Sequence, residues 1–364
     1  MTIAATLSRY IARQFAVWFF GVFLAIVSVS FVIDLIELLR RSSSKAEATF
    51  GLLLQMSVFK LPFLAQEILP FAMLFGSMIA FWRLTRSSEL LVARSAGVSA
   101  WQFLAPAFIV AVIVGAIAVS VFNPVASALR QRHDAIESRI LKGRTSEFAL
   151  SRSGLWLRQN DGDGPAILHA LRVSNDDGRL IDVSVLLFRD EDKLVRRIDA
   201  ESAILEDGNW RLANAFAWAP GQPSRPVGEF VLPTTMTSRS LQDSFAAPET
   251  ISFWELPAFI QLIESAGFPA HRHRLYFHSL LAQPLLLGAL VLIAATFALR
   301  PARRGGTTWM IVGGVLTGFL LHFLSDVIFA LGLSASIPIP LAAWTPTGIC
   351  LLVGASILLH AEDG

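Results

Sequence analysis

The stretch FAVWFFGVFLAIVSVSFVIDLI, residues 15–36, decides the class of fold. Asp34 is its only charged residue, and its apolar side chains follow one another without the alternation of a half-buried strand. A helix needs about 20 mostly apolar residues to cross a hydrocarbon core roughly 30 Å thick. Arg9 and Arg13 precede the stretch, but it is longer than the apolar region of a signal peptide. We therefore predict a retained transmembrane helix and an integral membrane protein.

Five further runs pass the same test of length and apolar content. With the first they predict six transmembrane helices, at 15–36, 52–81, 101–122, 275–299, 307–331 and 337–360. Backbone polar groups cannot stay unpaired in lipid, which favours helices over open strands. The composition agrees, because 54% of the residues are apolar and 16% are charged, against about 25% charged in an average soluble domain.

The remaining composition excludes several classes. A formal net charge of +2 gives no argument for a nucleic-acid partner. Cys350 is the only cysteine, so the chain can form neither an internal disulfide nor a cysteine-built metal site. We expect no bound metal or cofactor and no catalytic residue in this chain.

The character of the sequence changes between residues 123 and 273. Charged residues are frequent there, and strand-like runs lie at 155–158, 166–173, 180–188, 194–198 and 210–218. Residues 202–213, centred on Asp207-Gly208, predict a hairpin because Asp-Gly tolerates the positive φ of a tight turn. We predict an all-β domain of the sandwich or jelly-roll type, flanked by helices at 123–141 and 253–265. The chain then divides into helical residues 1–122, a β domain at 123–273, and helical residues 274–364.

The Lys and Arg residues of the short connections predict the orientation. With the N-terminus inside, eight of them lie on the inner side, namely Arg9, Arg13, Arg83, Arg86, Arg94, Arg300, Arg303 and Arg304. Three lie on the outer side, namely Arg40, Arg41 and Lys45. The side richer in basic residues is normally cytoplasmic. We predict cytoplasmic termini and, since three spans precede it, a β domain on the far side of the membrane.

Residues 85–99, TRSSELLVARSAGVS, predict a short amphipathic helix between the second and third spans. Ser87 or Ser88 is suited to its N-cap, Glu89 to its first turn, and Gly97 to its end. An ordinary connecting helix explains this pattern, and so does a coupling helix that inserts into a groove on a cytoplasmic motor subunit. The chain has no Gly-x-x-x-x-Gly-Lys-Ser/Thr motif, so a motor that uses ATP would have to be a partner.

Arginines near the outer ends of two spans are candidates for binding a lipid phosphate. Arg40 and Arg41 follow the first span, and Arg130 and Arg132 follow the third. A guanidinium presents a planar fork of donors that suits phosphate, although a single arginine more often contacts ordinary phospholipid or solvent. Charged residues within spans are functional candidates by default, which singles out Asp34 in the first span, Glu37 just beyond it, and His322 with Asp326 in the fifth. We expect the last two, at i and i+4, to pair.

The whole chain resembles the LptF/LptG permease family, the membrane subunits of the lipopolysaccharide export ABC transporter. The residues that carry the resemblance are Arg9-Tyr10-Ile11, Arg86-Ser87-Ser88-Glu89-Leu90-Leu91 through Ala96-Gly97, Trp210-Arg211-Leu212, Arg274-Leu275-Tyr276, Gln283-Pro284 and Arg300-Pro301. The order of three spans, a β domain and three spans also matches, and the pattern is closer to the LptG branch.

The resemblance implies a pseudo-symmetric pair with an LptF-like permease on a dimer of the ATPase LptB, which would use the ATP and Mg. It implies extraction of lipopolysaccharide from the inner membrane and its transfer to LptC-like and LptA-like proteins. It places Glu89, Leu90, Arg94 and Gly97 in the coupling helix. It places Arg40 and Arg41, with Arg130 and Arg132 nearby, against the lipid phosphates, and we expect Leu69 and Phe319 to line the substrate path. The first and fifth spans would form lateral gates. Asp34 departs from relatives that carry a basic residue near this point.

Two other functions remain open. A membrane-anchored sensor or assembly scaffold would share the β domain but would need no motor and no phosphate-binding arginines. A secondary transporter would need charge pairs deep in the membrane, and only His322 and Asp326 come near that requirement.

Overall fold

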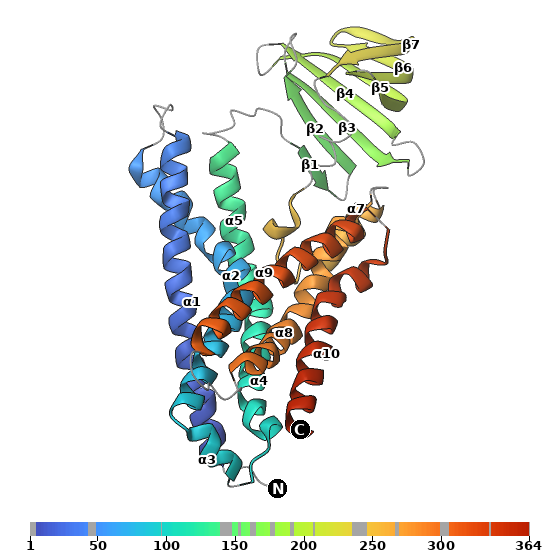
Figure 1. Ribbon diagram of the computed structural model, residues 1–364. Coiled ribbons are helices and arrows are strands. Elements are labelled where there is room, and N and C mark those ends of the chain that lie inside the picture. Colours follow the sequence, from blue (N-terminus) through green and yellow to red (C-terminus); the bar gives the residue numbers. More distant parts are fainter. Residues whose placement is uncertain are drawn as a thin grey trace. The chain divides into compact units, whose positions relative to one another are not determined.

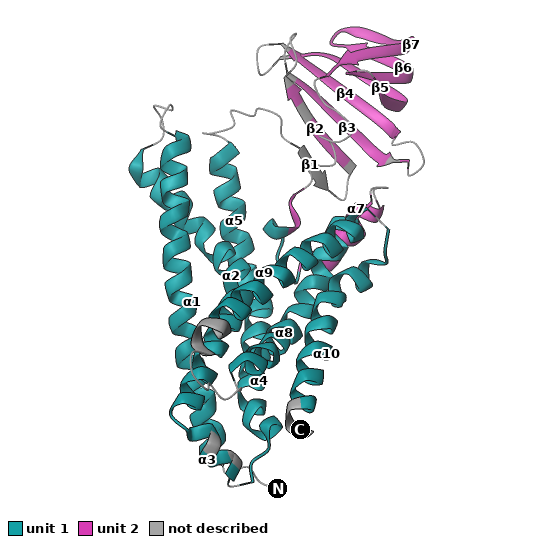
Figure 2. Ribbon diagram, viewed as in Figure 1, with its two compact units in different colours: residues 1–141, 249–254, 271–364 teal, residues 142–248, 255–270 magenta. Residues whose placement is uncertain are grey.

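The computed structural model describes residues 5–42, 49–95, 97–138, 148–151, 154–160, 165–174, 179–189, 193–206, 208–234, 246–265, 269–298, 306–334 and 336–363. The chain forms two compact units, shown in Figure 2. A helix unit comprises residues 1–141, 249–254 and 271–364, and a β unit comprises residues 142–248 and 255–270. The Asp-Gly pairs at 161–164 and 177–178, and also Lys45, Arg300, Arg303 and Arg304, lie outside the described residues.

Six helices of the helix unit are long and apolar enough to cross a membrane, as predicted. They are α1 (Ala5–Ser42), α2 (Phe50–Arg86), α4 (Ala100–Ile117) with its continuation, α8 (His271–Ala298), α9 (Gly306–Leu333) and α10 (Ile339–Asp363). The third continues through one π-helical turn, η1 (Ala118–Phe122), into α5 (Asn123–Glu137). Pro124, which has no backbone N–H to donate, lies just after this π-helical turn and does not interrupt the helix. The helical unit therefore extends past residue 122.

Helix α8 is the most buried of the six spans, α1 and α9 are the least buried, and α1 lies along one side of the helix unit (Figure 1). In the most apolar window of each helix, 67% of the residues of α8 are buried, against 11% in α1 and 11% in α9. Helices α1 and α2 pack closely at Gly76, where an added Cβ would lie 2.7 Å from the Cα of Phe19. Small residues of this kind let helix backbones approach in a membrane.

The β unit contains one antiparallel sheet whose described strands run in sequence order. They are β1 (Phe148–Ser151), β2 (Gly154–Asn160), β3 (Pro165–Val173), β4 (Leu180–Arg189), β5 (Lys193–Glu206), β6 (Asn209–Ala219) and β7 (Gln222–Pro233). The inserted all-β domain is confirmed. Each strand pairs with its neighbours along the chain, so the described strands form a meander and lack the Greek-key crossovers of a jelly roll. Short hairpin connections explain this order, because they leave adjacent strands no route to cross over.

The hairpin predicted around Asp207-Gly208 is confirmed. Glu206 pairs with Asn209, and Gly208 has φ +74°. Strand β6 then alternates buried Trp210 and Leu212 with exposed neighbours until Asn214, whose φ of +53° marks a bulge. The bulge adds a residue to the strand and returns Ala215 to the buried face.

The unit also contains α7 (Leu256–Ser265), which buries Leu256, Ile260 and Ile263 at helical spacing. The predicted helical flank at 253–265 is therefore present from Leu256 onward, whereas the other flank, α5, belongs to the helix unit.

Candidate functional site

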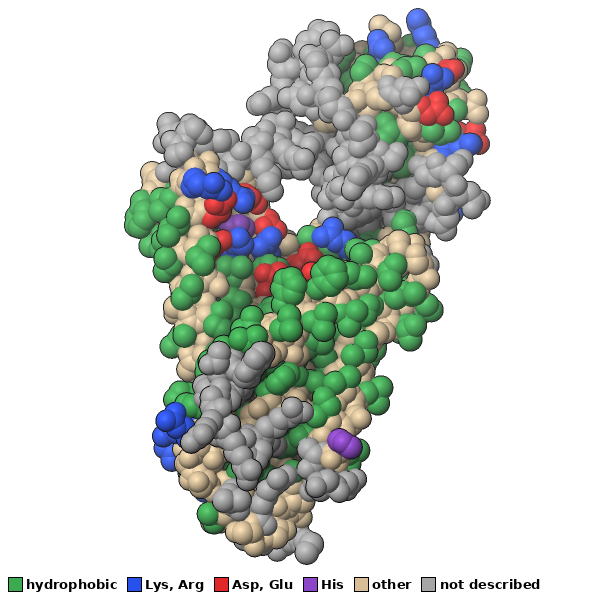
Figure 3. All heavy atoms as spheres, viewed as in Figure 1, with side chains coloured by type: hydrophobic (Ala, Val, Ile, Leu, Met, Phe, Trp, Pro, Cys, Tyr) green, Lys and Arg blue, Asp and Glu red, His purple; other side chains and the backbone are tan. Residues whose placement is uncertain are grey.

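Charged side chains gather at one end of the helix unit, where α1 ends, α2 begins and α5 ends. We call it the upper end, as it is drawn in Figure 1. Figure 3 shows acidic and basic side chains together there, above a face of the same unit that is mostly apolar. A buried cluster of Leu38, Leu53 and Met56, with Ile136 packed against it, joins α1, α2 and α5. The upper end therefore offers charge to a ligand beside apolar surface.

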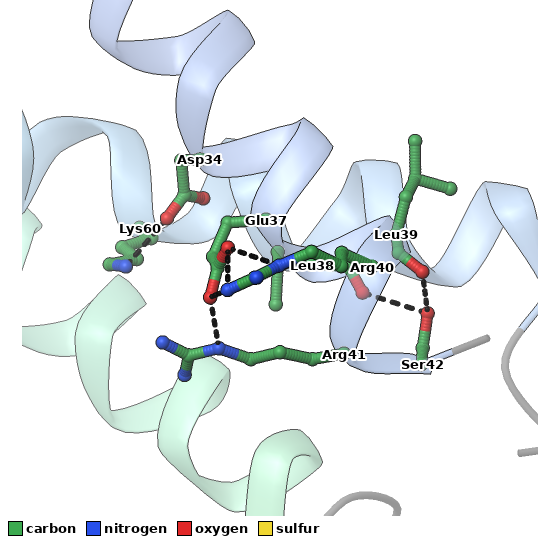
Figure 4. A network of polar contacts seen from close by, with 8 residues as sticks. All are labelled: Asp34, Glu37, Leu38, Leu39, Arg40, Arg41, Ser42 and Lys60. Atoms are coloured by element: carbon green, nitrogen blue, oxygen red, sulfur yellow. Dashed lines mark hydrogen bonds and ion pairs between the residues drawn. The ribbon is translucent and has the colours of Figure 1, made fainter. Parts of the chain in front are cut away.

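Glu37 contacts both arginines at the end of α1 (Figure 4). Arg40 donates from Nε and Nη2 to the two carboxylate oxygens of Glu37, at 3.0 and 2.9 Å. Arg41 donates from Nε to the same carboxylate at 2.7 Å. The arginine side chains are nevertheless 76% and 60% exposed. The last turn of α1 thus presents two exposed guanidinium groups that share one acid.

Asp34 connects α1 to α2. The Nζ of Lys60 lies 2.6 Å from its Oδ1, and the hydroxyl of Ser57 donates to its Oδ2 at 2.9 Å. The Asp34 side chain is only 9% exposed, and a buried carboxylate needs such partners to stay charged. The acid that departs from the family pattern is therefore neutralised within the protein. No role was predicted for Lys60, although a lysine inside the predicted span 52–81 is a signal for one.

Arg130 and Arg132 lie on different faces of α5. The guanidinium of Arg130 lies over the ring of Phe63 in α2, 4.6 Å from the ring centre, and its Nε is 3.1 Å from Oδ1 of Asp134. Arg132 is exposed, and residues two apart in a helix do not share a face. The structure therefore brings Arg130, and not Arg132, to the side of α5 that packs on α2.

Three neighbouring side chains on α5 lie close enough to share a metal ion, namely His133, Asp134 and Glu137. The Nδ1 of buried His133 is 2.9 Å from the carbonyl oxygen of Met56, and Asp134 pairs with Arg130. These contacts explain the histidine as a link between α5 and α2, and the aspartate as a partner of Arg130 within α5. We therefore assign no metal to this group.

A pocket of about 190 Å³ lies between α2, α8, α9 and α10. Most of its lining is apolar, with Glu67 and His322 among the polar exceptions. The Nε2 of His322 is 3.6 Å from Oδ2 of Asp326, so the expected i, i+4 contact is present. The His322 ring also packs edge-on against Phe71 of α2, with ring centres 5.5 Å apart. Glu67, like Lys60, is a charged residue within a span for which no role was predicted from the sequence.

The two residues expected along the substrate path have opposite surroundings. Phe319 is 65% exposed on α9, among other exposed apolar side chains: Ile311, Val315, Leu316, Leu320 and Phe323. Leu69 is 5% exposed and packs in the main core of the helix unit. In this conformation Phe319 is therefore accessible to an apolar ligand, whereas Leu69 is not.

The π-helical turn holds the segment through which the chain returns from the β unit. Asn123, 1% exposed, accepts a hydrogen bond from the backbone N–H of Phe253 at 2.8 Å. The Trp254 indole donates to the Ser120 carbonyl at 2.9 Å, and the Phe253 ring stacks on Phe277 of α8. A π-turn leaves backbone carbonyls free for such contacts. We call Ser120, Asn123, Phe253 and Trp254 the clasp.

At the opposite, lower end, α3 (Glu89–Ser95) confirms the short helix predicted between the second and third spans. Leu90 and Ala93 are buried in the main core, whereas Val92 is 65% exposed. Gly97 has φ +82°, which suits the residue that follows a helix. The side chain of Arg94 lies outside the described residues. One face of α3 thus packs on the core of the helix unit, and the opposite face is exposed.

The fold and the site define a class: a multi-pass membrane protein whose helix unit has a charged upper end, an exposed connecting helix at its lower end and an inserted β domain. The sequence matches the family described as "Lipopolysaccharide export system permease LptF/LptG" over residues 9–360, and the chain belongs to this family. The predicted resemblance is confirmed, and with it the assignment to a multi-pass protein of the inner membrane.

Two relatives are both named lipopolysaccharide export system permease protein LptG. The chain is 22% identical to that of Escherichia coli K12 over 360 residues, which cover 97% of this chain and 98% of the relative. It is 23% identical to that of Haemophilus influenzae over 375 residues, which cover 98% of this chain and 99% of the relative. The likeness therefore spans both units and not the helices alone.

Proposed function

We propose that this chain is the LptG-like half of a lipopolysaccharide exporter, with its upper end at the periplasmic face and its lower end in the cytoplasm. The excess of basic residues at the lower end supports this orientation, with both termini cytoplasmic and the β unit periplasmic. In this role the chain takes lipopolysaccharide from the outer leaflet of the inner membrane and passes it toward a periplasmic bridge. It breaks no covalent bond itself.

The observation that carries the proposal is the set of cations at the upper end. Arg40 and Arg41 expose their guanidinium groups there, and Arg130 lies at the same end of the unit on α5. In the proposed orientation these groups lie at the level of lipid headgroups, where a guanidinium fork binds phosphate oxygens in pairs. Arg132, on the other face of α5, has no part in this site.

Helices α1 and α9 supply the apolar walls of the path. They are the least buried of the six spans, and Phe319 projects from α9. We assign these faces to the lateral gates formed with an LptF-like partner. Each acyl CH₂ that leaves the bilayer loses about 0.8 kcal/mol unless an apolar surface replaces the lipid. A chamber between two such faces offers this replacement, and its closure expels the chains.

Helix α3 is the proposed coupling helix. Its buried residues Leu90 and Ala93 attach it to the helix unit, so a push on its exposed face moves the unit as a body. The force comes from an LptB-like ATPase dimer that binds the ATP and Mg. Glu89 and Val92 would contact that dimer directly, whereas Leu90 holds the helix in place. The β unit would pass the lipid to LptC-like and LptA-like proteins.

The test is lipopolysaccharide transfer by the full chain, reconstituted in nanodiscs with its partner permease and ATPase. We expect ATP-dependent transfer to a periplasmic acceptor, strongly reduced by the double change Arg40→Ala with Arg41→Ala. Glu89→Arg should instead reduce ATPase association. Arg225→Ala, which removes the same charge from exposed β7, is the control and should transfer normally. Transfer that is absent with ATP, while the β unit still binds a partner, would favour the sensor or scaffold.

A further inference from the structure

We propose that Glu37 is an internal substitute for the lipid phosphate: it occupies Arg40 and Arg41 in the empty site and selects for ligands that carry phosphate monoesters. The inference rests on the proposed function, because it assigns a role to an acid inside the proposed phosphate site. It adds a residue that determines specificity and names the chemical group that this residue selects.

The geometry of the contact is that of a bound anion. Two nitrogens of the Arg40 fork reach the two oxygens of Glu37 at 3.0 and 2.9 Å, and Arg41 adds a third bond at 2.7 Å. Carboxylate and phosphate both match this fork through paired oxygen atoms. Figure 4 shows both guanidinium groups directed at the one carboxylate. A phosphate that binds the Nε–Nη2 edge of Arg40 must therefore displace Glu37.

Glu37 is placed so that it can be displaced. Its side chain is 34% exposed and contacts residues one turn further along its own helix. Asp34, one turn earlier, is 9% exposed and is held by Lys60 and Ser57 of α2. Ion pairs that are exposed to solvent are weak, so Glu37 can rotate into solvent at small cost. Asp34 instead forms part of the packing between α1 and α2.

The charge of the lipid phosphate determines which lipids can displace Glu37 from Arg40 and Arg41. A phosphate monoester carries about −1.5 to −2 at neutral pH, whereas a carboxylate carries −1. A diester, as in the phosphatidylglycerol of a bilayer, has a single ionisable oxygen and also carries −1. The diester therefore gains little charge advantage over Glu37, whereas the monoester gains a large one. Glu37 thus discriminates against the abundant lipids that surround the protein and weakens retention, which favours release.

The experiment measures retention of bis-phosphorylated lipid A by the complete complex without ATP, in nanodiscs with increasing phosphatidylglycerol. In the wild-type complex we expect phosphatidylglycerol to compete weakly. Glu37→Gln should bind lipid A about two- to fivefold more tightly, the range expected when the weak, exposed contacts of Glu37 with the two arginines no longer compete. The same variant should become sensitive to phosphatidylglycerol and release lipid A more slowly after ATP is added. Glu201→Gln, an equal charge change in the β unit, should match the wild type.

The outcomes separate the inference from the function on which it rests. If Glu37→Gln retains wild-type affinity and selectivity while Arg40→Ala with Arg41→Ala loses lipid A, the phosphate site stands and the role of Glu37 is wrong. If the arginine changes also leave retention unchanged, the phosphate site itself is wrong. Dephosphorylated lipid A should show no difference between wild type and Glu37→Gln, and a gain with that probe would refute the inference.

Discussion

Asp34 of α1 and Lys60 of α2 form an ion pair of 2.6 Å, and Asp34 lies six residues before Arg40, the first of the paired arginines of α1. The pair joins two helices at the upper end, and the Ser57 hydroxyl adds a second bond to the same carboxylate. Because Asp34 is nearly buried, its charge depends on these partners. The contact therefore positions the end of α1 on which Arg40 and Arg41 lie.

Replacing Asp34 should consequently reduce the stability of the helix unit. Asp34→Asn leaves the Lys60 ammonium partly buried without its acid, and we expect a loss of about 1–3 kcal/mol. Thermal unfolding of the purified protein in detergent measures it. Ser57→Ala removes one neutral donor and should cost less. The exchange of the two residues, Asp34→Lys with Lys60→Asp, should recover part of the loss, and a wild-type melting temperature for Asp34→Asn would contradict the assignment.

The close approach of α1 to α2 at Gly76 gives a second prediction. Gly76→Ala places a methyl group 2.7 Å from the Cα of Phe19, so the helices must separate. We expect a loss of about 1–3 kcal/mol, as for overpacked cores. Gly21→Ala in α1 is the matched control, because no atom lies within 4 Å of its added Cβ. Its better helix propensity should leave the melting temperature equal or higher. Equal melting of the two variants would show that α1 does not pack at Gly76.

The sequence predicted the parts of the fold that depend on local patterns. Six apolar runs of sufficient length predict six spans, because the length that a helix needs to cross the bilayer does not depend on which helices it packs against. Strand β7 was missed because Pro223, Pro226 and Gly228 argue against a strand, yet an edge strand tolerates such residues. The order of the strands was not predicted, because it depends on pairing between strands, which the alternation of side chains does not encode.

In the site too, contacts between residues close in the sequence could be predicted and contacts between distant residues could not. Contacts between residues three or four apart, such as His322 with Asp326, follow from helical spacing. The contact between Asp34 and Lys60 joins residues 26 apart on different helices, so no spacing rule reaches it. That Arg130 and Arg132 lie on opposite faces could have been predicted from the sequence, because side chains two positions apart in a helix point in directions that differ by more than half a turn.

The clasp gives a third prediction. Asn123→Ala removes the acceptor of the Phe253 backbone N–H, together with two longer contacts of 3.4 Å to Gln66 and Tyr276. The Phe253 amide should then exchange its hydrogen about tenfold faster or more, which corresponds to one buried hydrogen bond. Hydrogen exchange followed by mass spectrometry of the peptide around residue 253 measures this. Trp254→Phe removes only the bond to Ser120 and should have a smaller effect.

The exposed face of α3 gives a fourth prediction. Val92→Glu adds charge to a side chain that is 65% exposed, so the permease should fold normally but lose its ATPase during co-purification. Burying an unpaired charge at an interface costs several kcal/mol, enough to lower affinity more than tenfold. Leu90→Ala, in the core, should instead lower the melting temperature. If Val92→Glu retains the ATPase fully, α3 does not insert its exposed face into the partner.

The apolar face of α9 gives the last prediction. A photoreactive benzoylphenylalanine at Phe319 should crosslink to lipopolysaccharide in the reconstituted complex, because this side chain is 65% exposed on the proposed gate. The same group at Phe81, which is fully buried in the helix core, should not crosslink. ATP hydrolysis should reduce the Phe319 product, since closure of the chamber expels the acyl chains. A product at Phe319 that contains only phospholipid, with or without ATP, would show that this face meets bulk lipid and that the substrate path lies elsewhere.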